Sequence, residues 1–305
     1  MNVNYINENN YWTNFLGLSR TLLALSTFIT LLFNNTTLLF FSGVSNENKP
    51  NIDNLSLNVY TWFPSIEYGY WLSIGILFFV IIGVFPRITC FFHWLVTYSY
   101  FNLTTIADGG DQIASIVTFL LIPICIFDKR KWHWHRKNYE HNFYENMIAN
   151  IFHWLIVLQV FIIYFFAAVG KFDVEEWKNG TALYYWFTEP LFGPTNFYMP
   201  LIDFILKSSF LSTFLTWLVL LFELTLSFTI FTSNKKIKRK LLIAGILFHF
   251  GILIFFGLVS FFLTMTACLI LFLNSKNTNY DYNNFNITNP FRYIVNLSSN
   301  STKKN

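Results

Sequence analysis

The sequence predicts an all-α fold, a polytopic bundle of about eight transmembrane helices. Hydrophobic residues make up 54% of its 305 residues, and aromatic residues 21%. Charged residues make up only 12%, about half of the roughly 25% typical of soluble domains. Apolar runs also recur at about the length of 20 residues that a helix needs to cross a bilayer. This composition excludes a soluble globule, a disordered chain and a nucleic-acid-binding domain.

Six apolar runs are each long enough for one predicted span, and they lie at residues 15–33, 70–85, 88–106, 112–127, 147–170 and 211–232. A further apolar block covers 241–273. As a single helix it would be about 50 Å long, which is too long for one crossing of a core about 30 Å thick. Gly257 and Ser260 near its middle predict a tight hairpin of two short spans, which brings the count to eight.

The basic residues predict the orientation, because loops rich in Lys and Arg stay in the cytoplasm. Two such segments, 128–145 and 233–240, should therefore be cytoplasmic. The long segments 34–69 and 172–206 are poor in Lys and Arg and should lie outside. With eight spans both termini are cytoplasmic.

Three regions follow from this reading: a polar N-terminal segment (1–14), a transmembrane domain (15–273) and a polar, partly disordered cytoplasmic tail (274–305). Cys90, Cys125 and Cys268 lie inside apolar runs and should be buried as small apolar side chains.

Ionisable residues inside spans are costly and are candidates for function. Arg20, His93 and His153 should lie near the cytoplasmic face, where snorkelling would account for Arg20. Glu223 and His249 should lie near the middle of the membrane, each ~18 Å from the outer face. Because consecutive spans are usually neighbours, these two side chains could pair, as a structural clamp or as part of a site.

At the outer face, Asp108-Gly-Gly-Asp111 follows the third span. Asp111 can cap the next helix, whereas capping accounts less well for Asp108. Lys171 ends the fifth span on the same helical face as Tyr164 and Ala168. An amine kept from water there could act as a base or nucleophile; a lysine that snorkels to the interface is the alternative.

No zinc-protease motif is found, and no metal site is expected. His133, His135 and His141 lie in the basic segment after the fourth span, the first two alternating with Trp132 and Trp134. This alternation predicts an interfacial belt beside anionic lipid.

The stretch from Tyr164 to Tyr184 resembles the pattern A-x-x-K-hydrophobic-[DN]…W-x-x-G-x-A-L of the horizontally transferred transmembrane (HTTM) family, which includes the membrane part of vitamin K-dependent gamma-glutamyl carboxylase. Arg20, the Asp108–Asp111 turn, and His249 before Gly257 also resemble that family. The resemblance covers 15–273 and is greatest for the sporulation-delaying protein B subfamily. Its members are bacterial membrane proteins that help convert a secreted precursor into a peptide toxin.

The resemblance implies a bacterial cell-membrane protein that matures or modifies an exported peptide, and it puts Lys171 at the catalytic-lysine position of the carboxylase. In this hypothesis Asp108 and Asp111 orient or titrate Lys171, while Glu223 and His249 form the floor of an outward-facing pocket or a proton relay. The expected partners are membrane lipids, the exported precursor and a small soluble protein. Any cofactor would, by resemblance alone, be a quinone-like lipid.

Two other functions stay open at this point. One is a non-enzymatic scaffold, export or immunity module that binds such a peptide, so the sequence leaves open whether the protein is an enzyme. The other is a transporter that uses Glu223 and His249 as a proton-coupling pair, although no inverted repeat supports it.

Overall fold

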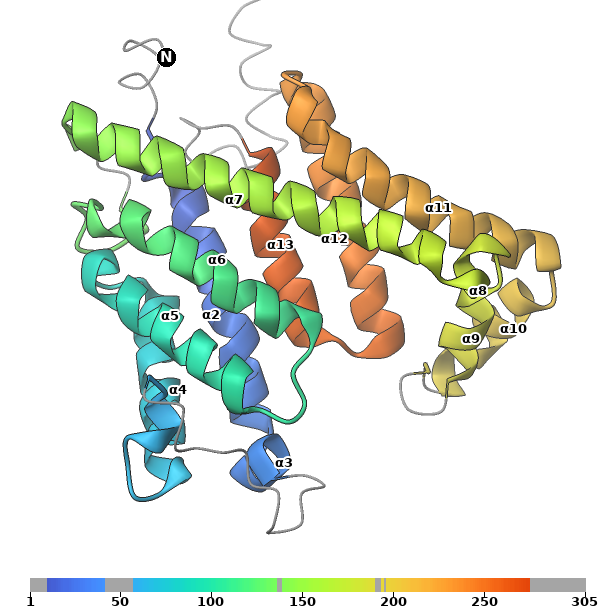
Figure 1. Ribbon diagram of the computed structural model, residues 1–305, viewed down its shortest axis with the longest axis horizontal. Coiled ribbons are helices and arrows are strands. Elements are labelled where there is room, and N and C mark those ends of the chain that lie inside the picture. Colours follow the sequence, from blue (N-terminus) through green and yellow to red (C-terminus); the bar gives the residue numbers. More distant parts are fainter. Residues whose placement is uncertain (1–9, 42–56, 136–138, 190–192, 195, 275–305) are drawn as a thin grey trace, which may run out of the picture.

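The computed structural model describes residues 10–41, 57–135, 139–189, 193–194 and 196–274 (Figure 1). It confirms the all-α prediction, because these residues contain helices and one isolated bridge, between Val84 and Trp132, but no strand. The long helices are α2 (Asn14–Phe33), α4 (Ile66–Ile82), α5 (Pro86–Leu103), α6 (Gly109–Ile126), α7 (Phe143–Gly170), α11 (Ser209–Phe228), α12 (Lys235–Phe256) and α13 (Val259–Leu273). The short helices are α3 (Thr36–Phe41), α8 (Glu175–Lys178), α9 (Ala182–Thr188) and α10 (Met199–Leu206).

The long helices coincide with the predicted spans. By length and hydropathy, α2, α6, α7, α11 and α12 can each cross a membrane, while α4 and α13 are shorter apolar helices. The number that cross remains a prediction. The boundaries 1–14, 15–273 and 274–305 also remain predictions, and residues 1–9 and 275–305 lie outside the described part of the chain.

The predicted hairpin in the last apolar block is present. Gly257 ends α12 in the left-handed conformation, with φ of 71°, and its N–H donates to the carbonyl of Leu253 at 2.9 Å. Glycine adopts this conformation at little cost. The chain then turns at Leu258 into α13, which packs against α12.

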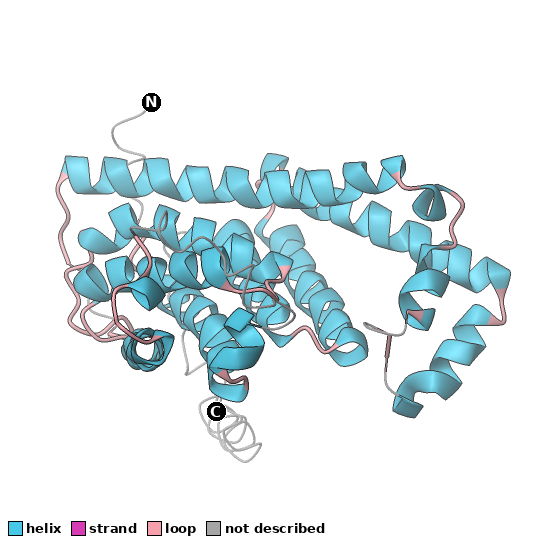
Figure 2. Ribbon diagram, turned by 60° about the horizontal axis from the view of Figure 1, so that its bottom comes forward, coloured by secondary structure: helices cyan, strands magenta, loops and turns pink. Residues whose placement is uncertain are grey.

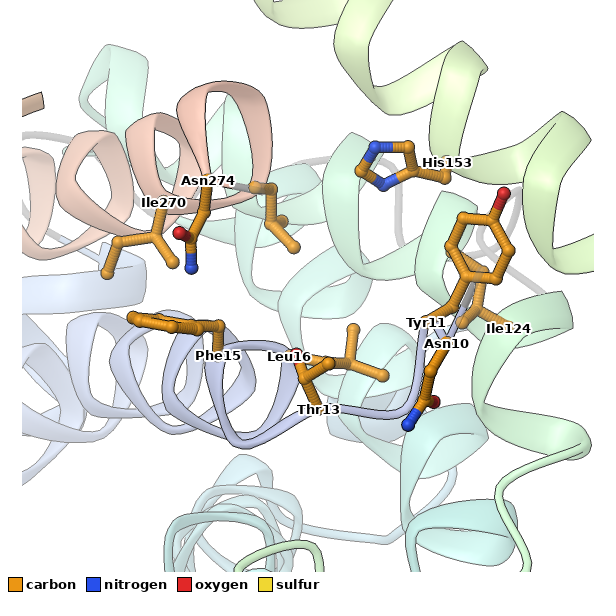
Figure 3. Close-up of a pocket in the computed structure, with 10 residues that line it drawn as sticks. Asn10, Tyr11, Thr13, Phe15, Leu16, Ile124, His153, Ile270 and Asn274 are labelled. Atoms are coloured by element: carbon orange, nitrogen blue, oxygen red, sulfur yellow. The ribbon is translucent and has the colours of Figure 1, made fainter. Parts of the chain in front are cut away.

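The start and the end of the helical bundle lie side by side. Asn10, Tyr11 and Leu16 at the start of α2, together with Ile270 and Asn274 at the end of α13, line a cavity of about 40 Å³ (Figure 3). The first and last long helices therefore begin and end on the same side, as an even number of crossings requires. We call this the inner end, because the basic residues Lys129–Lys131 lie in the loop beside it; Trp12 Nε1 donates to the carbonyl of Ile124 just before that loop at 2.8 Å.

The loop after α6 is buried at the inner end of the bundle, and two expectations about this end were wrong. His133 is fully buried rather than part of an interfacial belt. Arg20 is 1% exposed and does not snorkel: its Nη1 lies 3.4 Å from His133 Nδ1, and its Nη2 donates to Thr89 Oγ1 at 3.0 Å. Burial, with the positive charges of Arg20 and Arg130, lowers the pKa of His133 to about 2.

A buried ion pair fixes this loop. The guanidinium of Arg130 donates to both carboxylate oxygens of Asp128, at 2.8 and 2.7 Å, and to the carbonyl of His133 at 2.7 Å. Gly83 ends α4 with φ of 93° directly against the His133 ring. The loop is therefore an ordered part of the core and not a surface belt.

Two helices cross the rest of the bundle. Figures 1 and 2 show α7 lying across α13 and α12, with α11 beside it. The 28 residues of α7 make a helix about 42 Å long, which must tilt to fit a core about 30 Å thick. Its last residues and α11 carry the candidate site.

Candidate functional site

The centre of the candidate site is an ion pair between α7 and α11. Lys171 Nζ lies 2.6 Å from Glu223 Oε2 and also donates to the carbonyl of Ala167 at 2.9 Å. The ring of Trp177 lies 5.1 Å from the same nitrogen, close enough for a cation–π interaction. The side chains of Lys171 and Glu223 are 21% and 10% exposed, so the pair is largely shielded from water but still accessible.

The sequence of α7 places the lysine. Tyr164 and Ala168, on the same face, are buried at 2% and 0% exposure, as the helical periodicity predicts. Lys171 follows as the C-cap of α7, at the start of the 3-10 turn Lys171–Asp173. A cation at this end of a helix is stabilised by the helix dipole.

The contact corrects the expected depths. Glu223 was expected mid-membrane and Lys171 at the outer mouth, but the two side chains are in contact. Residues 209–222, the first 14 residues of α11, therefore lie between the start of that helix and the level of Lys171. They correspond to about 21 Å along the helix axis. The reason is the oblique course of α7, which brings Lys171 at its end beside Glu223 in the second half of α11.

His249 has a different partner from the one expected. Its Nε2 shares a hydrogen bond of 2.8 Å with the Tyr164 hydroxyl, and its Nδ1 is buried with no hydrogen-bond partner. No hydrogen bond or ion pair joins His249 to Glu223, because Glu223 binds Lys171. The expected pair is thus replaced by two pairs, both anchored on α7.

The two aspartates build the start of α6. The Asp108 carboxylate accepts from the N–H of Asp111 at 3.0 Å, and the Asp111 carboxylate accepts from the N–H of Asp108 at 3.0 Å. This is a reciprocal capping box, so capping accounts for both residues. Asp108 also accepts a hydrogen bond from the Ser260 hydroxyl at the start of α13.

These contacts connect the aspartates to α13 and not to Lys171. Among the described residues, neither aspartate has a hydrogen bond or ion pair with Lys171, and the carboxylate that contacts Lys171 is that of Glu223. The aspartates approach His249 only indirectly: Gly110 packs on Phe261, whose ring centroid lies 5.4 Å from that of His249. Asp111 Oδ1 is buried without a hydrogen-bond partner.

Two cavities among the described residues lie elsewhere. One of about 380 Å³ runs between Trp94, Tyr98 and Phe101 of α5 and Gln112, Ile116 and Phe119 of α6. None of the five predicted site residues lines this cavity or the one at the inner end. The quinone-like lipid that the resemblance suggested remains a prediction.

Three contributors were not predicted from the sequence. Trp177 approaches the lysine from the segment after α7, Tyr164 binds His249 across 85 residues, and Ser260 binds Asp108 across 152. Tyr164 gave a signal by its position on the face of Lys171, and Trp177 is the tryptophan of the family-like pattern, but neither contact was predicted. The other contacts depend on how α12, α13 and the outer loops pack.

The chain is similar to two proteins of Bacillus subtilis (strain 168). It is 40% identical to sporulation-delaying protein SdpB over 282 residues, which cover 92% of this chain and 87% of that protein. It is 36% identical to the uncharacterized protein YitO over 274 residues, which cover 87% of each. No protein-family model and no solved structure matches it, so the wider HTTM and carboxylase resemblance remains a prediction.

Proposed function

Because the chain belongs to the family of sporulation-delaying protein SdpB, we propose that it is a multi-pass bacterial membrane protein required to mature an exported, toxin-like peptide. The name of that relative connects the relative to a sporulation-delaying activity. The alignment with it covers 92% of this chain. The apolar helices support a place in the membrane. The precursor of the peptide, and a small soluble protein that assists, are the proposed partners.

The ion pair supports a specific role for Lys171. Nζ lies 2.6 Å from Glu223 Oε2, so one proton can pass from the ammonium to the carboxylate and leave a neutral amine beside a neutral acid. That amine can accept a proton from the bound precursor, and the acid can return one. The HTTM resemblance implies a catalytic lysine at the same position.

The same geometry also supports the non-enzymatic alternative. The ammonium of Lys171 already has three partners, namely Glu223, the carbonyl of Ala167 and the ring of Trp177. In a scaffold or immunity module this arrangement would only join α7 to α11. A substitution that keeps the charge separates the two functions.

Lys171→Arg is that substitution. Arginine can keep an ion pair with Glu223, but it does not deprotonate in proteins. We expect Lys171→Arg to insert normally and to reduce the yield of mature peptide to the level of Lys171→Ala, measured in cells with matched membrane levels of each variant.

Lys178→Arg is the matched control, since Lys178 is exposed at the end of α8, seven positions from Lys171. It should keep the normal yield. A near-normal yield from Lys171→Arg would remove the proton-transfer role and favour the scaffold.

A further inference from the structure

The segment between α7 and α11 exposes several large apolar side chains. We call residues 172–208 the outer segment, of which 172–189, 193–194 and 196–208 are described. Its exposed apolar side chains include Trp186, Phe197, Leu201 and Phe204; Phe197 is 83% exposed and Phe204 68%. Its low content of Lys and Arg predicts that this segment lies outside the cytoplasm. Exposed apolar surface of this kind indicates contact with lipid or with another protein.

The outer segment packs beside the bundle and not beyond its end. The ring of Phe187 stacks on Phe256 at 5.8 Å with an interplanar angle of 8°, and Tyr198 meets Phe255 at 5.5 Å. Both partners lie in the last turn of α12. Figure 1 accordingly shows α9 and α10 next to the lower end of α12, near the level of its turn into α13.

The exposed apolar surface continues into a predicted span. α10 leads through Lys207 and Ser208 into α11, where Phe210 is 78% exposed and Phe214 and Leu221 are also exposed. α11 is long and apolar enough to cross a membrane. An outward apolar face on such a helix contacts lipid, and only the short exposed polar stretch Lys207–Ser209 lies between it and Phe204.

The composition of the outer segment also suits the interface. Tyr184, Tyr185 and Trp186 are consecutive and exposed, and such aromatic residues gather at the level of the lipid headgroups. Asp203 and Lys207, both exposed, lie on or next to α10, where their charges can reach water or headgroups. A surface that faced another protein would not need to be continuous with the lipid face of α11.

We propose that α9, α10 and the described residues between them lie in the outer interfacial layer of the bilayer, with Phe197, Leu201 and Phe204 among the acyl chains. Trp177 of the outer segment contacts Lys171, so a substrate would reach the ion pair from the lipid side. Its substrate would then be an apolar peptide already partitioned into the membrane. Only this last statement rests on the proposed function.

The placement can be tested with an environment-sensitive fluorophore on a single added cysteine. Cys90, Cys125 and Cys268 are buried, so labelling should be selective in the full-length protein in liposomes. We expect the label on Phe204→Cys and Phe197→Cys to be quenched by lipids that carry a nitroxide on the upper acyl chain, and to be protected from aqueous iodide.

Glu176→Cys on α8 is the control, because this exposed acidic position should be quenched mainly by iodide. Quenching of the Phe204 label by iodide as strong as at position 176 would overturn the proposal. Protection of that label from both quenchers would also overturn it, since protein would then cover the surface. The readout needs no peptide, so its failure would leave the proposed role of Lys171 untouched.

Discussion

The Nζ of Lys171 and Oε2 of Glu223 lie 2.6 Å apart although 52 positions separate them in the chain. This pair joins the end of α7 to the middle of α11 and closes the loop that contains the outer segment. It therefore has a structural role whether or not it also transfers a proton, and the two roles can be measured separately.

The structural role predicts coupling between the two residues. Lys171→Met leaves a buried carboxylate without its cation, and Glu223→Gln leaves the ammonium without its anion; either should lower the stability. We expect the double variant to lose less than the sum, with a coupling of about 0.5–3 kcal/mol. Unfolding in detergent measures this, and strictly additive losses would show that the ion pair does not form.

Tyr164→Phe should destabilise the protein. It removes the hydroxyl bonded to His249 Nε2, and His249 is only 2% exposed, so its Nε2 becomes a second buried ring nitrogen without a partner. The expected loss is about 1–3 kcal/mol. The matched control is Tyr68→Phe, at a 64% exposed tyrosine, and equal thermal midpoints for the two variants would contradict the hydrogen bond.

Acidification should unfold the protein through His133. Its pKa is lowered to about 2 in the folded state, against about 6.5 in an unfolded chain. Below pH 6.5 the unfolded state therefore binds a proton that the folded state does not, and stability falls by up to about 1.4 kcal/mol per pH unit until the pH approaches 2.

The test compares His133→Gln with wild type. The thermal midpoint of the variant should decline less steeply between pH 6.5 and 4.5, whereas that of His135→Gln, at an exposed position, should follow wild type. Parallel profiles for wild type and His133→Gln would mean that His133 is protonated in the folded protein.

The topology prediction concerns the hairpin. Reporters fused after Lys240 and after Asn274 should both read cytoplasmic, because α12 and α13 each cross once. Residues at the start of α2 and at the end of α13 line the same cavity, which supports this prediction. An extracytoplasmic reading at Asn274 would reduce the count to seven.

Local patterns in the sequence were enough to predict the long helices, but not the short helices α3, α8, α9 and α10. Apolar runs gave the long helices, Gly257 gave the turn between α12 and α13, and the face of Tyr164, Ala168 and Lys171 was correct. These features depend on residues close together in the chain, so periodicity and turn chemistry suffice.

The partners of the polar residues could not be predicted in this way. Depth counted from helix ends matched Glu223 with His249, because it assumed upright helices, and the oblique α7 brings Lys171 to Glu223 instead. Arg20 was assigned to the interface from its depth in the first span, and His133 from its alternation with tryptophans in a basic segment. Their burial depends on a loop that folds back between helices, for which no spacing rule exists.

The contact between α2 and α13 has a consequence for biosynthesis. Among the described long helices, α2 is the first to leave the ribosome and α13 the last, yet the two pack along each other. Leu16 and Leu23 of α2 belong to the same apolar core as Cys268 and Leu269 of α13. The nascent chain must therefore hold α2 in the membrane without this neighbour until α13 has been synthesised. A chain that stops before Val259 would leave that face open, so a late nonsense mutation should be as damaging as an early one.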